Sequence, residues 1–330
     1  MDRGADFLLS GTTALKTEDL KDQMQLVTIG KTDLATALQT PKRLSNYCAQ
    51  LEAGDILFFP QTPIDIPGDD LAFLLGHQQV GGAYHKNIAY RPLEDRITGF
   101  DAQDSTGAKR LRGIMRRYSD DVIGFLRGFL GPYGARWKVD YASYRPEEEQ
   151  GRDLSLRKRN DLLHTDAFPT RPTNGDRILR FFNNINPQKT RSWITTETFD
   201  ALVEKMRTGK LNGGRVPLPS SMTSSAAKRA LASLGLGTLA PSLRRSPYDE
   251  FMMRFHNFLK ENSEFQKTCP KQHWEFPPGS SWMVYTDMVS HAVLSGQFAL
   301  EQTLIVSREV MVIPEKSPYG VLSRLAISQN

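Results

Sequence analysis

Cysteine is scarce in this chain: only Cys48 and Cys269 occur among its 330 residues. Two thiols cannot supply a disulfide framework or a cysteine-based zinc site, and such scarcity is typical of a reducing compartment. Long apolar runs are also missing, since no stretch approaches the roughly 18 apolar residues of a membrane-spanning helix. Residues 1–22 lack the apolar core of a secretory signal. We therefore expect a cytoplasmic protein that does not cross a membrane.

Signatures of nucleotide binding are absent as well. The sequence contains neither the G-x-G-x-x-G pattern nor a Walker motif, so a nucleotide-dependent activity has no support.

The balance of charge is basic, with a formal net charge of +5 and an isoelectric point near 9.1. Basic residues cluster at 109–117 and at 152–159. Such clusters suit an anionic partner, such as a phosphate, a carboxylate or a negative membrane surface, and they are equally typical of a solvated face. They lack regular aromatic interleaving, so we do not expect nucleic-acid binding. No feature of the sequence implies a protein partner.

Histidine is another scarce residue, with six in the chain. His164 and Asp166 lie two positions apart, between Leu162–Leu163 and Ala167–Phe168. In an extended strand these two side chains would point to the same face. Alone, such a triplet is more often a surface turn or a hydrogen-bonded pair than a metal site. Histidine and carboxylate are nevertheless two of the three ligands in the facial triad of non-haem Fe(II) oxygenases.

The third ligand of such a triad has to come from a distant segment. His291 is the best candidate, because it lies among apolar residues in a strand-rich block near the C-terminus. Few other histidines compete for this role. If strand pairing brings His291 to His164 and Asp166, the three side chains form a facial triad that leaves positions open on the metal.

Residue patterns predict a mixed α+β fold. Strand-rich blocks with helices outside them favour a double-stranded β-helix, or jelly roll, with flanking helices over an alternating βαβ fold. We expect one domain over 1–330, with an insertion at about 208–247. Helical spacing of apolar residues predicts helices at Thr32–Gln39, Arg110–Leu130, Trp193–Arg207, Ser225–Leu234 and Pro247–Glu261. Alternating or short apolar runs predict strands at Glu52–Pro60, Trp137–Arg145, His164–Asp166, Arg177–Ile185, Ser281–Tyr285, His291–Leu294 and Ala299–Val306.

Three longer stretches of the sequence resemble a known family. SYRPEEEQGRDLSLRKRNDLLHTDAFPTRPTNGDRILRFFNNINP, HKNIAY and SSWMVYTDMVSHAVLSGQFALEQT resemble the 3-deoxy-D-manno-oct-2-ulosonic acid (Kdo) 3-hydroxylases of Gram-negative bacteria. The resemblance implies a jelly-roll core and an Fe(II)- and 2-oxoglutarate-dependent dioxygenase that consumes O2. His164, Asp166 and His291 would ligate the iron.

The implied reaction is hydroxylation at C3 of the outer Kdo sugar of Kdo-lipid A, in the biosynthesis of the lipopolysaccharide inner core. It would be coupled to oxidative decarboxylation of 2-oxoglutarate to succinate and CO2. A glycolipid acceptor implies peripheral contact with the cytoplasmic face of the inner membrane.

The distal carboxylate of 2-oxoglutarate needs a cation, best supplied by the planar fork of an arginine. Many relatives carry this arginine on the strand after the distal histidine, where this sequence has Glu301 and Gln302. Other relatives place it on the strand after His-x-Asp, where Arg177 and Arg180 stand. Their odd spacing puts them on opposite faces, and we favour Arg180. Asn184 and Gln302 are further candidates to bind the co-substrate.

Substrate binding is expected from basic residues near the triad, because Kdo carries a carboxylate and lipid A carries phosphates. The candidates are Arg145, Arg157, Arg159 and Arg171. Two rival functions stay open. A protein or peptide hydroxylase of the same barrel type could hold a peptide on the basic patches, and a non-catalytic barrel could bind anionic sugars.

Overall fold

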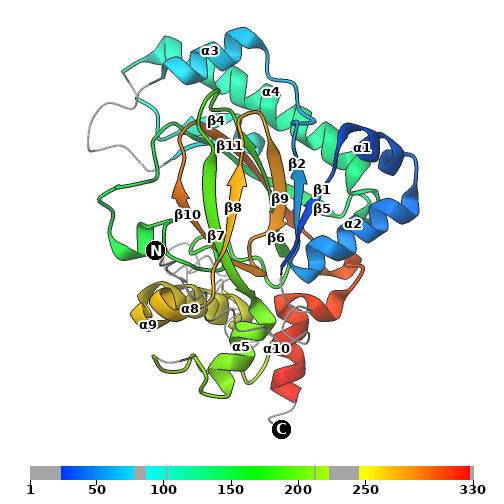
Figure 1. The fold of residues 1–330 in the computed structure, drawn as a ribbon, viewed down its shortest axis with the longest axis vertical. Helices are drawn as coiled ribbons and strands as arrows, with labels where there is room; N and C mark the ends of the chain where they lie inside the picture. Colours follow the sequence, from blue (N-terminus) through cyan, green and yellow to red (C-terminus); the bar gives the residue numbers. More distant parts are fainter. Residues whose placement is uncertain (1–23, 78–86, 102, 212, 223–244, 328–330) are drawn as a thin grey trace, which may run out of the picture.

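Two β-sheets face each other at the centre of the molecule, and helices surround them (Figure 1). The computed structural model describes residues 24–77, 87–101, 103–211, 213–222 and 245–327. In spatial order, the larger sheet contains β1 (Leu26–Thr28), β2 (Ile56–Phe59), β9 (Ser281–Tyr285), β6 (Arg177–Asn184), β11 (Ala299–Val306), β5 (Trp137–Arg145), β3 (Ile88–Arg91) and β4 (Arg96–Thr98). The smaller sheet contains β10 (Val289–Ser295), β7 (Arg191–Thr198) and β8 (Gln272–Phe276). Apart from the parallel β1–β2 pair, neighbouring strands run antiparallel, as the predicted jelly roll requires.

Aromatic side chains fill the space between the two sheets. Trp282 of β9 stacks on Phe276 of β8, with ring centroids 3.9 Å apart, and on Phe182 of β6 at 5.1 Å. Trp193 of β7 meets the Trp282 ring edge-on at 5.5 Å. Such pairs add about 0.5–1.5 kcal/mol each beyond the burial of their area. This aromatic layer holds the sheets together beside the site described below.

The long helix α4 (Ser105–Phe129) covers the outer face of the larger sheet. Its Tyr118 hydroxyl donates to Asn183 of β6 at 2.7 Å, and its Ser119 hydroxyl donates to Gln302 of β11 at 2.8 Å. The prediction of a helix at Arg110–Leu130 is confirmed. The helix begins earlier because the Asp104 side chain caps its first turn by accepting from the Gly107 amide.

The other helices are α1 (Lys31–Leu38), α2 (Pro41–Ala53), α3 (Gly68–Gly76), α5 (Phe199–Arg207), α8 (Pro247–Glu261), α9 (Ser263–Thr268) and α10 (Pro318–Ile327). Figure 1 shows α5, α8, α9 and α10 gathered at one end of the sheets. Among the described residues, no helix combines the length and the apolar character that a membrane crossing needs.

One element prediction was wrong in part. A single helix was expected over Trp193–Arg207, but β7 extends to Thr198 and the helix, α5, begins at Phe199. All residues from Trp193 to Thr198 except Glu197 are aromatic or β-branched, which favours a strand, and β10 and β8 pair with this strand on its two sides. Thr198 stands at the N-cap of α5 without a side-chain capping hydrogen bond, and the helix begins six residues later than expected.

The segment around His164 also differs from its prediction. Residues 164–166 form no regular strand, and a single antiparallel bridge joins His164 to His291. The helix expected at Ser225–Leu234 lies outside the described residues. The single domain with an insertion at about 208–247 stays a prediction.

Candidate metal centre

The three predicted metal ligands lie together. His164, Asp166 and His291 are all buried, and one potential ligand atom from each lies within 4.8 Å of the other two. The His164 amide donates to the His291 carbonyl at 3.1 Å, and the His291 amide donates back at 2.9 Å. The Asp166 amide donates to the Thr286 carbonyl at 2.7 Å. Main-chain pairing therefore brings both histidines, far apart in the sequence, to one point beside the carboxylate.

The hydrogen bonds of the two histidines leave one ring nitrogen of each available to a metal. Nδ1 of His164 lies 2.7 Å from the Leu162 carbonyl, and Nδ1 of His291 lies 2.9 Å from the Val289 carbonyl. A carbonyl only accepts, so each Nδ1 carries the proton and each Nε2 keeps its lone pair. A backbone carbonyl behind a ligating imidazole is a frequent arrangement at metal sites.

The protonation states also suit a metal. Burial lowers the pKa of His164 well below its usual value and lowers the pKa of His291 as well, so both rings are neutral at physiological pH. Burial by itself would raise the pKa of Asp166. The Arg180 charge and the contact with His164 outweigh burial, so the pKa of Asp166 lies well below its usual range. Two neutral imidazoles and one carboxylate are the donor set of the facial triad, so these residues fit Fe(II).

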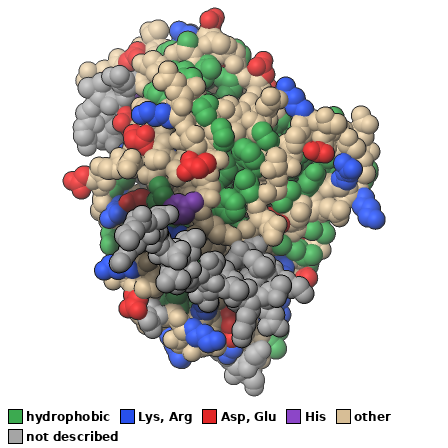
Figure 2. Space-filling model, in the orientation of Figure 1, with side chains coloured by type: hydrophobic (Ala, Val, Ile, Leu, Met, Phe, Trp, Pro, Cys, Tyr) green, Lys and Arg blue, Asp and Glu red, His purple; other side chains and the backbone are tan. Residues whose placement is uncertain are grey.

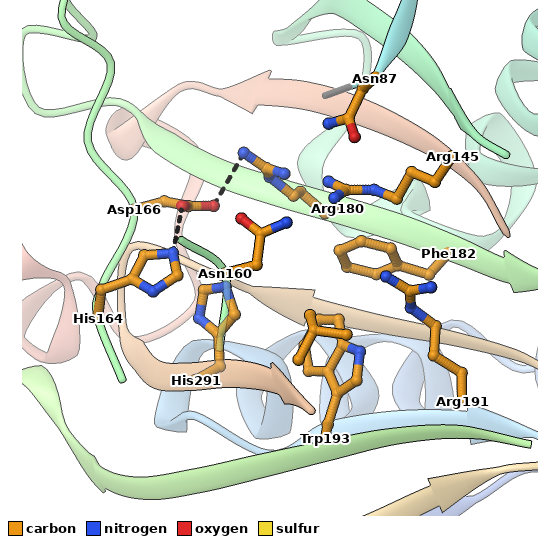
Figure 3. A pocket seen from close by; sticks show the side chains of 11 residues that line it. Asn87, Arg145, Asn160, His164, Asp166, Arg180, Phe182, Arg191, Trp193 and His291 are labelled. Atoms are coloured by element: carbon orange, nitrogen blue, oxygen red, sulfur yellow. Dashed lines mark ion pairs between the residues drawn. The ribbon is translucent and has the colours of Figure 1, made fainter. Parts of the chain in front are cut away.

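A pocket of about 160 Å³ opens beside the three ligands (Figure 3). Arg145, Arg180 and Arg191 enter it from β5, β6 and β7. The remaining lining residues are Asn87, Asn160, Phe182, Trp193 and Val293. The Trp193 ring stacks on the His291 ring, with centroids 5.3 Å apart, so the aromatic layer of the core also supports a metal ligand.

Buried carboxylates balance the three arginines. Glu301 accepts from Arg145 at 2.5 Å and from Arg180 at 2.6 Å. Arg180 also lies 2.9 Å from Asp166, and Glu149 lies 3.4 Å from both Arg145 and Arg191. Burial lowers the pKa of Arg191 to about 10, which leaves it charged at physiological pH.

Several buried polar atoms around the pocket have no hydrogen-bond partner among the described residues. They are Nε of Arg180, Nε of Arg191, Nε1 of Trp193 and Oδ1 of Asn87. Buried polar groups in folded proteins are normally satisfied, so a group of unsatisfied ones around one pocket indicates a polar ligand.

The candidates for co-substrate binding lie in different places. Arg180 lines the pocket, whereas Arg177 points to the opposite face of β6, where it pairs with Asp287 at 2.9 Å. Asn184 donates to the Phe276 carbonyl at 2.8 Å. Gln302 accepts from Ser119 on the side of α4. The structure therefore brings Arg180 to the ligands and engages the other three side chains elsewhere.

The candidates for substrate binding are also dispersed. Arg145 lines the pocket and is buried. Arg157 pairs with Glu261 at 2.8 Å, and Arg159 pairs with Asp161 at 2.5 Å. Arg171 pairs with Asp140 and lies over the rings of Tyr141 and Phe168. The last three arginines are not among the residues that line this pocket.

Sequence reasoning missed several residues of this pocket. They are the lining residues Asn87, Asn160 and Arg191. The roles of Glu149 and Glu301 as partners of the lining arginines were missed as well. Arg191 stands at the start of β7, which was taken for the approach to a helix. A strand reading of that segment would have pointed Arg191 and Trp193 to one face, since they are two residues apart.

Two facing antiparallel sheets with a His–Asp–His triad between them define the class of the protein, the non-haem Fe(II), 2-oxoglutarate-dependent dioxygenases. Comparison with known proteins is more specific. Residues 35–329 match the family model of 3-deoxy-D-manno-oct-2-ulosonic acid (Kdo) hydroxylase. The chain belongs to the Kdo hydroxylase family.

Solved structures of the Kdo hydroxylase KdoO are similar to this chain. The KdoO chain in the complex with α-ketoglutarate and Fe(III) shares 34% sequence identity with this chain, with a TM-score of 0.71. The match covers 86% of this chain and 90% of the KdoO chain. The complex with succinate and Fe(III) is 32% identical, with a TM-score of 0.74, covering 91% and 95%. The complex with cobalt(II) is 32% identical, with a TM-score of 0.75 and the same coverage. No curated protein sequence matches significantly.

Proposed function

We propose that this protein hydroxylates C3 of the outer Kdo sugar of Kdo-lipid A and couples this step to the oxidative decarboxylation of 2-oxoglutarate to succinate and CO2. The observation that carries the proposal is the buried His–Asp–His triad beside an arginine-lined pocket, in a member of the Kdo hydroxylase family. The reaction inserts one atom of O2 into the sugar and places the other in succinate.

His164, Asp166 and His291 hold Fe(II) in this proposal. When bound, the iron supplies open positions at which O2 and the co-substrate are activated. The protein contributes neutral imidazoles, an ionised carboxylate and a buried site. The carbonyls of Leu162 and Val289 hold the two imidazole rings in the orientation that leaves Nε2 free.

The charges around the pocket support a dianionic co-substrate. The three lining arginines pair with three carboxylates, Asp166, Glu149 and Glu301, so the formal charges of these six side chains sum to zero. Arg152 lies 3.9 Å from Glu149 and adds one positive charge beside this group. A divalent iron adds two positive charges, which a dicarboxylate such as 2-oxoglutarate neutralises. Unbalanced charge in a buried site is costly, so a dianion is favoured over a monoanion.

The arginines also supply the directional contacts for the co-substrate. Arg180, the residue favoured from the sequence, pairs with Asp166 and Glu301. Arg191 pairs with Glu149 and donates to the Gly296 carbonyl. Nε of Arg180 and Nε of Arg191 both lack a partner among the described residues. We assign the distal carboxylate to the cluster of Arg145, Arg180 and Arg191. KdoO is a relative whose structures hold α-ketoglutarate or succinate, which supports a dicarboxylate site in this family.

We assign binding of the acceptor, Kdo-lipid A, to polar side chains that line the pocket and to basic residues outside it. Asn87 and Asn160 carry hydrogen-bonding groups suited to sugar hydroxyls. Arg157, Arg159 and Arg171 lie outside the pocket and suit the phosphates of lipid A. A glycolipid acceptor places the protein at the cytoplasmic face of the inner membrane, in peripheral contact.

A mass-spectrometric assay tests the proposal. The purified protein is incubated with Fe(II), 2-oxoglutarate, O2 and Kdo-bearing lipid A, and the same mixture with lipid A that lacks Kdo is the matched control. We expect a gain of one oxygen atom in the Kdo-bearing lipid only, with an equal amount of succinate. Fragmentation of the product locates the new hydroxyl. Succinate formation without oxidation of the sugar, or oxidation of the Kdo-free lipid, would contradict the proposed substrate.

A further inference from the structure

The segment that carries two of the three metal ligands has little secondary structure of its own. Near the ligands, the chain between β5 and β6 pairs with β10 through one isolated bridge, His164 with His291, and through the Asn160 carbonyl, which accepts from the Val293 amide at 2.9 Å. The Asp166 amide donates to the Thr286 carbonyl in the turn after β9. A ligand segment of this kind needs support from elsewhere, because metal geometry tolerates displacements of only about 0.5 Å.

That support comes from the two helices beneath the segment, α8 and α9. The carboxamide of Gln266 on α9 accepts from the Leu163 amide at 2.9 Å and donates to the Leu163 carbonyl at 2.9 Å. It thus pairs with both main-chain groups of the residue before His164, as a neighbouring strand would. The same amide nitrogen also donates to the Leu259 carbonyl of α8 at 2.8 Å, so both amide hydrogens of Gln266 are hydrogen-bonded.

The residue between the two ligands is held in the same way. Nδ1 of His256 on α8 donates to the Thr165 carbonyl at 2.7 Å. The His256 ring also meets the His164 ring edge-on, with centroids 4.9 Å apart. Main-chain groups of the segment therefore alternate: those of His164 and Asp166 bind the sheets, and those of Leu163 and Thr165 bind the helices.

We infer that Gln266 and His256 are positioning residues that set the iron affinity of this protein by fixing the main chain of the His164–Asp166 segment. Neither residue lines the pocket, so they act through the ligands and not on the substrate. Helix α8, which carries His256, buries Phe251, Phe255 and Leu259. Helix α9, which carries Gln266, buries Phe265, so both helices keep apolar contacts when either polar side chain is changed. Loss of either hydrogen bond should therefore weaken metal binding more than it weakens the fold. The inference rests on the iron site of the proposed function.

Cobalt(II) titration of the metal-free protein, followed by visible absorption in the absence of 2-oxoglutarate, tests the inference. Gln266→Met keeps the size of the side chain without its polar groups, and His256→Phe keeps a ring without the donor. His256→Asn restores a donor near the position of Nδ1. Lys267→Ala is the matched control, because Lys267 is exposed and lies next to Gln266 on α9.

We expect the cobalt(II) dissociation constant to rise about 10-fold to 100-fold in Gln266→Met and in His256→Phe, the usual cost of removing a group that orients a metal ligand. His256→Asn should recover most of the loss, and Lys267→Ala should equal the parent. The thermal midpoint of the metal-free protein should change little. If Gln266→Met does not fold, the three-way comparison of the parent, His256→Phe and His256→Asn decides the point.

Parental affinity for cobalt(II) in both variants would overturn the inference, as would a lower midpoint of the metal-free protein with unchanged affinity. Failure of the parent protein to bind cobalt(II) would overturn both the inference and the proposed iron site. Weakened cobalt(II) binding in the variants, together with a parent that never oxidises Kdo-bearing lipid A, would leave the inference standing and contradict only the proposed substrate.

Discussion

Arg191 is the pocket residue whose substitution best separates charge from geometry. Arg191→Lys keeps the positive charge and loses the planar fork, and a charged hydrogen bond contributes about 1.5–3 kcal/mol. We expect the KM for 2-oxoglutarate to rise about 10-fold to 100-fold, measured by succinate formation. Arg136→Lys is the matched control, because Arg136 pairs with Glu309 at the surface, outside the pocket, and should leave this KM unchanged. An unchanged KM in Arg191→Lys would contradict the proposed carboxylate site.

Substitution of Arg177 should change the stability of the fold and not the KM for 2-oxoglutarate, although Arg177 lies only three residues from Arg180. It is fully buried with Asp287 on the face of β6 away from the pocket. Arg177→Met leaves the Asp287 charge without its partner, which should lower the free energy of unfolding by about 3–5 kcal/mol in urea denaturation. The KM for 2-oxoglutarate should stay unchanged. The double variant with Asp287→Leu should be more stable than the single one; equal stabilities would show that the unpaired charge is not the cause.

Lys260 gives the protein a predictable dependence of stability on pH. Burial lowers the pKa of Lys260 to about 8, from 10.5 in an exposed lysine. Between these two values the unfolded chain holds a proton that the folded chain has released, so the contribution of this group to stability rises as pH rises from 8 to 10.5. The slope should be at most about 1.4 kcal/mol per pH unit. Urea unfolding of the parent and of Lys260→Met at several pH values isolates this slope, and a constant difference between the two would contradict it.

At the scale of the elements, the start of α4 is set by one side chain. Asp104 accepts from the Gly107 amide at 2.8 Å, and the helix begins at Ser105. Asp104→Ala should lower the free energy of unfolding by about 1 kcal/mol. Asp120→Ala, an exposed change in the middle of the same helix, should stay within about 0.5 kcal/mol of the parent. Equal losses in the two variants would indicate an effect of charge and not of capping.

The same scale explains which elements could be predicted from the sequence. The apolar residues of α4 recur at helical spacing, so a local pattern identified the helix. The strand β7 was misread because its TTET run resembles a helix cap, and only its neighbours β10 and β8 make it a strand. The ligand segment was expected to be a strand, whereas His164 makes a single bridge to β10 and the Asp166 amide donates to Thr286 after β9. Its Leu163 and Thr165 main-chain groups bind α9 and α8.

At the scale of the whole molecule, metal and co-substrate should stabilise the fold together. Each ligand at about 100 times its Kd adds about 2.7 kcal/mol to the free energy of unfolding. Cobalt(II) and 2-oxoglutarate together should raise the thermal midpoint by more than the sum of their separate effects, because each neutralises the charge that the other brings into the buried site. Scanning fluorimetry with each ligand alone and with both measures this. Additive shifts would contradict the charge balance proposed for the pocket.

The metal ligands could be identified from the sequence by itself, because few histidines occur and one lies two residues from an aspartate in an apolar setting. The arginines of the pocket could be identified only in part: Arg180 and Arg145 were candidates, whereas Arg191 was missed, and their grouping depends on sheet register. β11 pairs with β6 so that Thr303 lies opposite Arg180, which places Glu301 within reach of both Arg180 and Arg145.

Residue types and their periodicity are local properties, so the sequence by itself predicted α1, α4 and α8, six strands (β2, β5, β6, β9, β10 and β11) and the chemistry of its triad. Which distant side chains share one pocket is decided by strand pairing and by the packing of α8 and α9 under the ligands. Those pairings join residues 91 or more positions apart, and no local pattern predicts them.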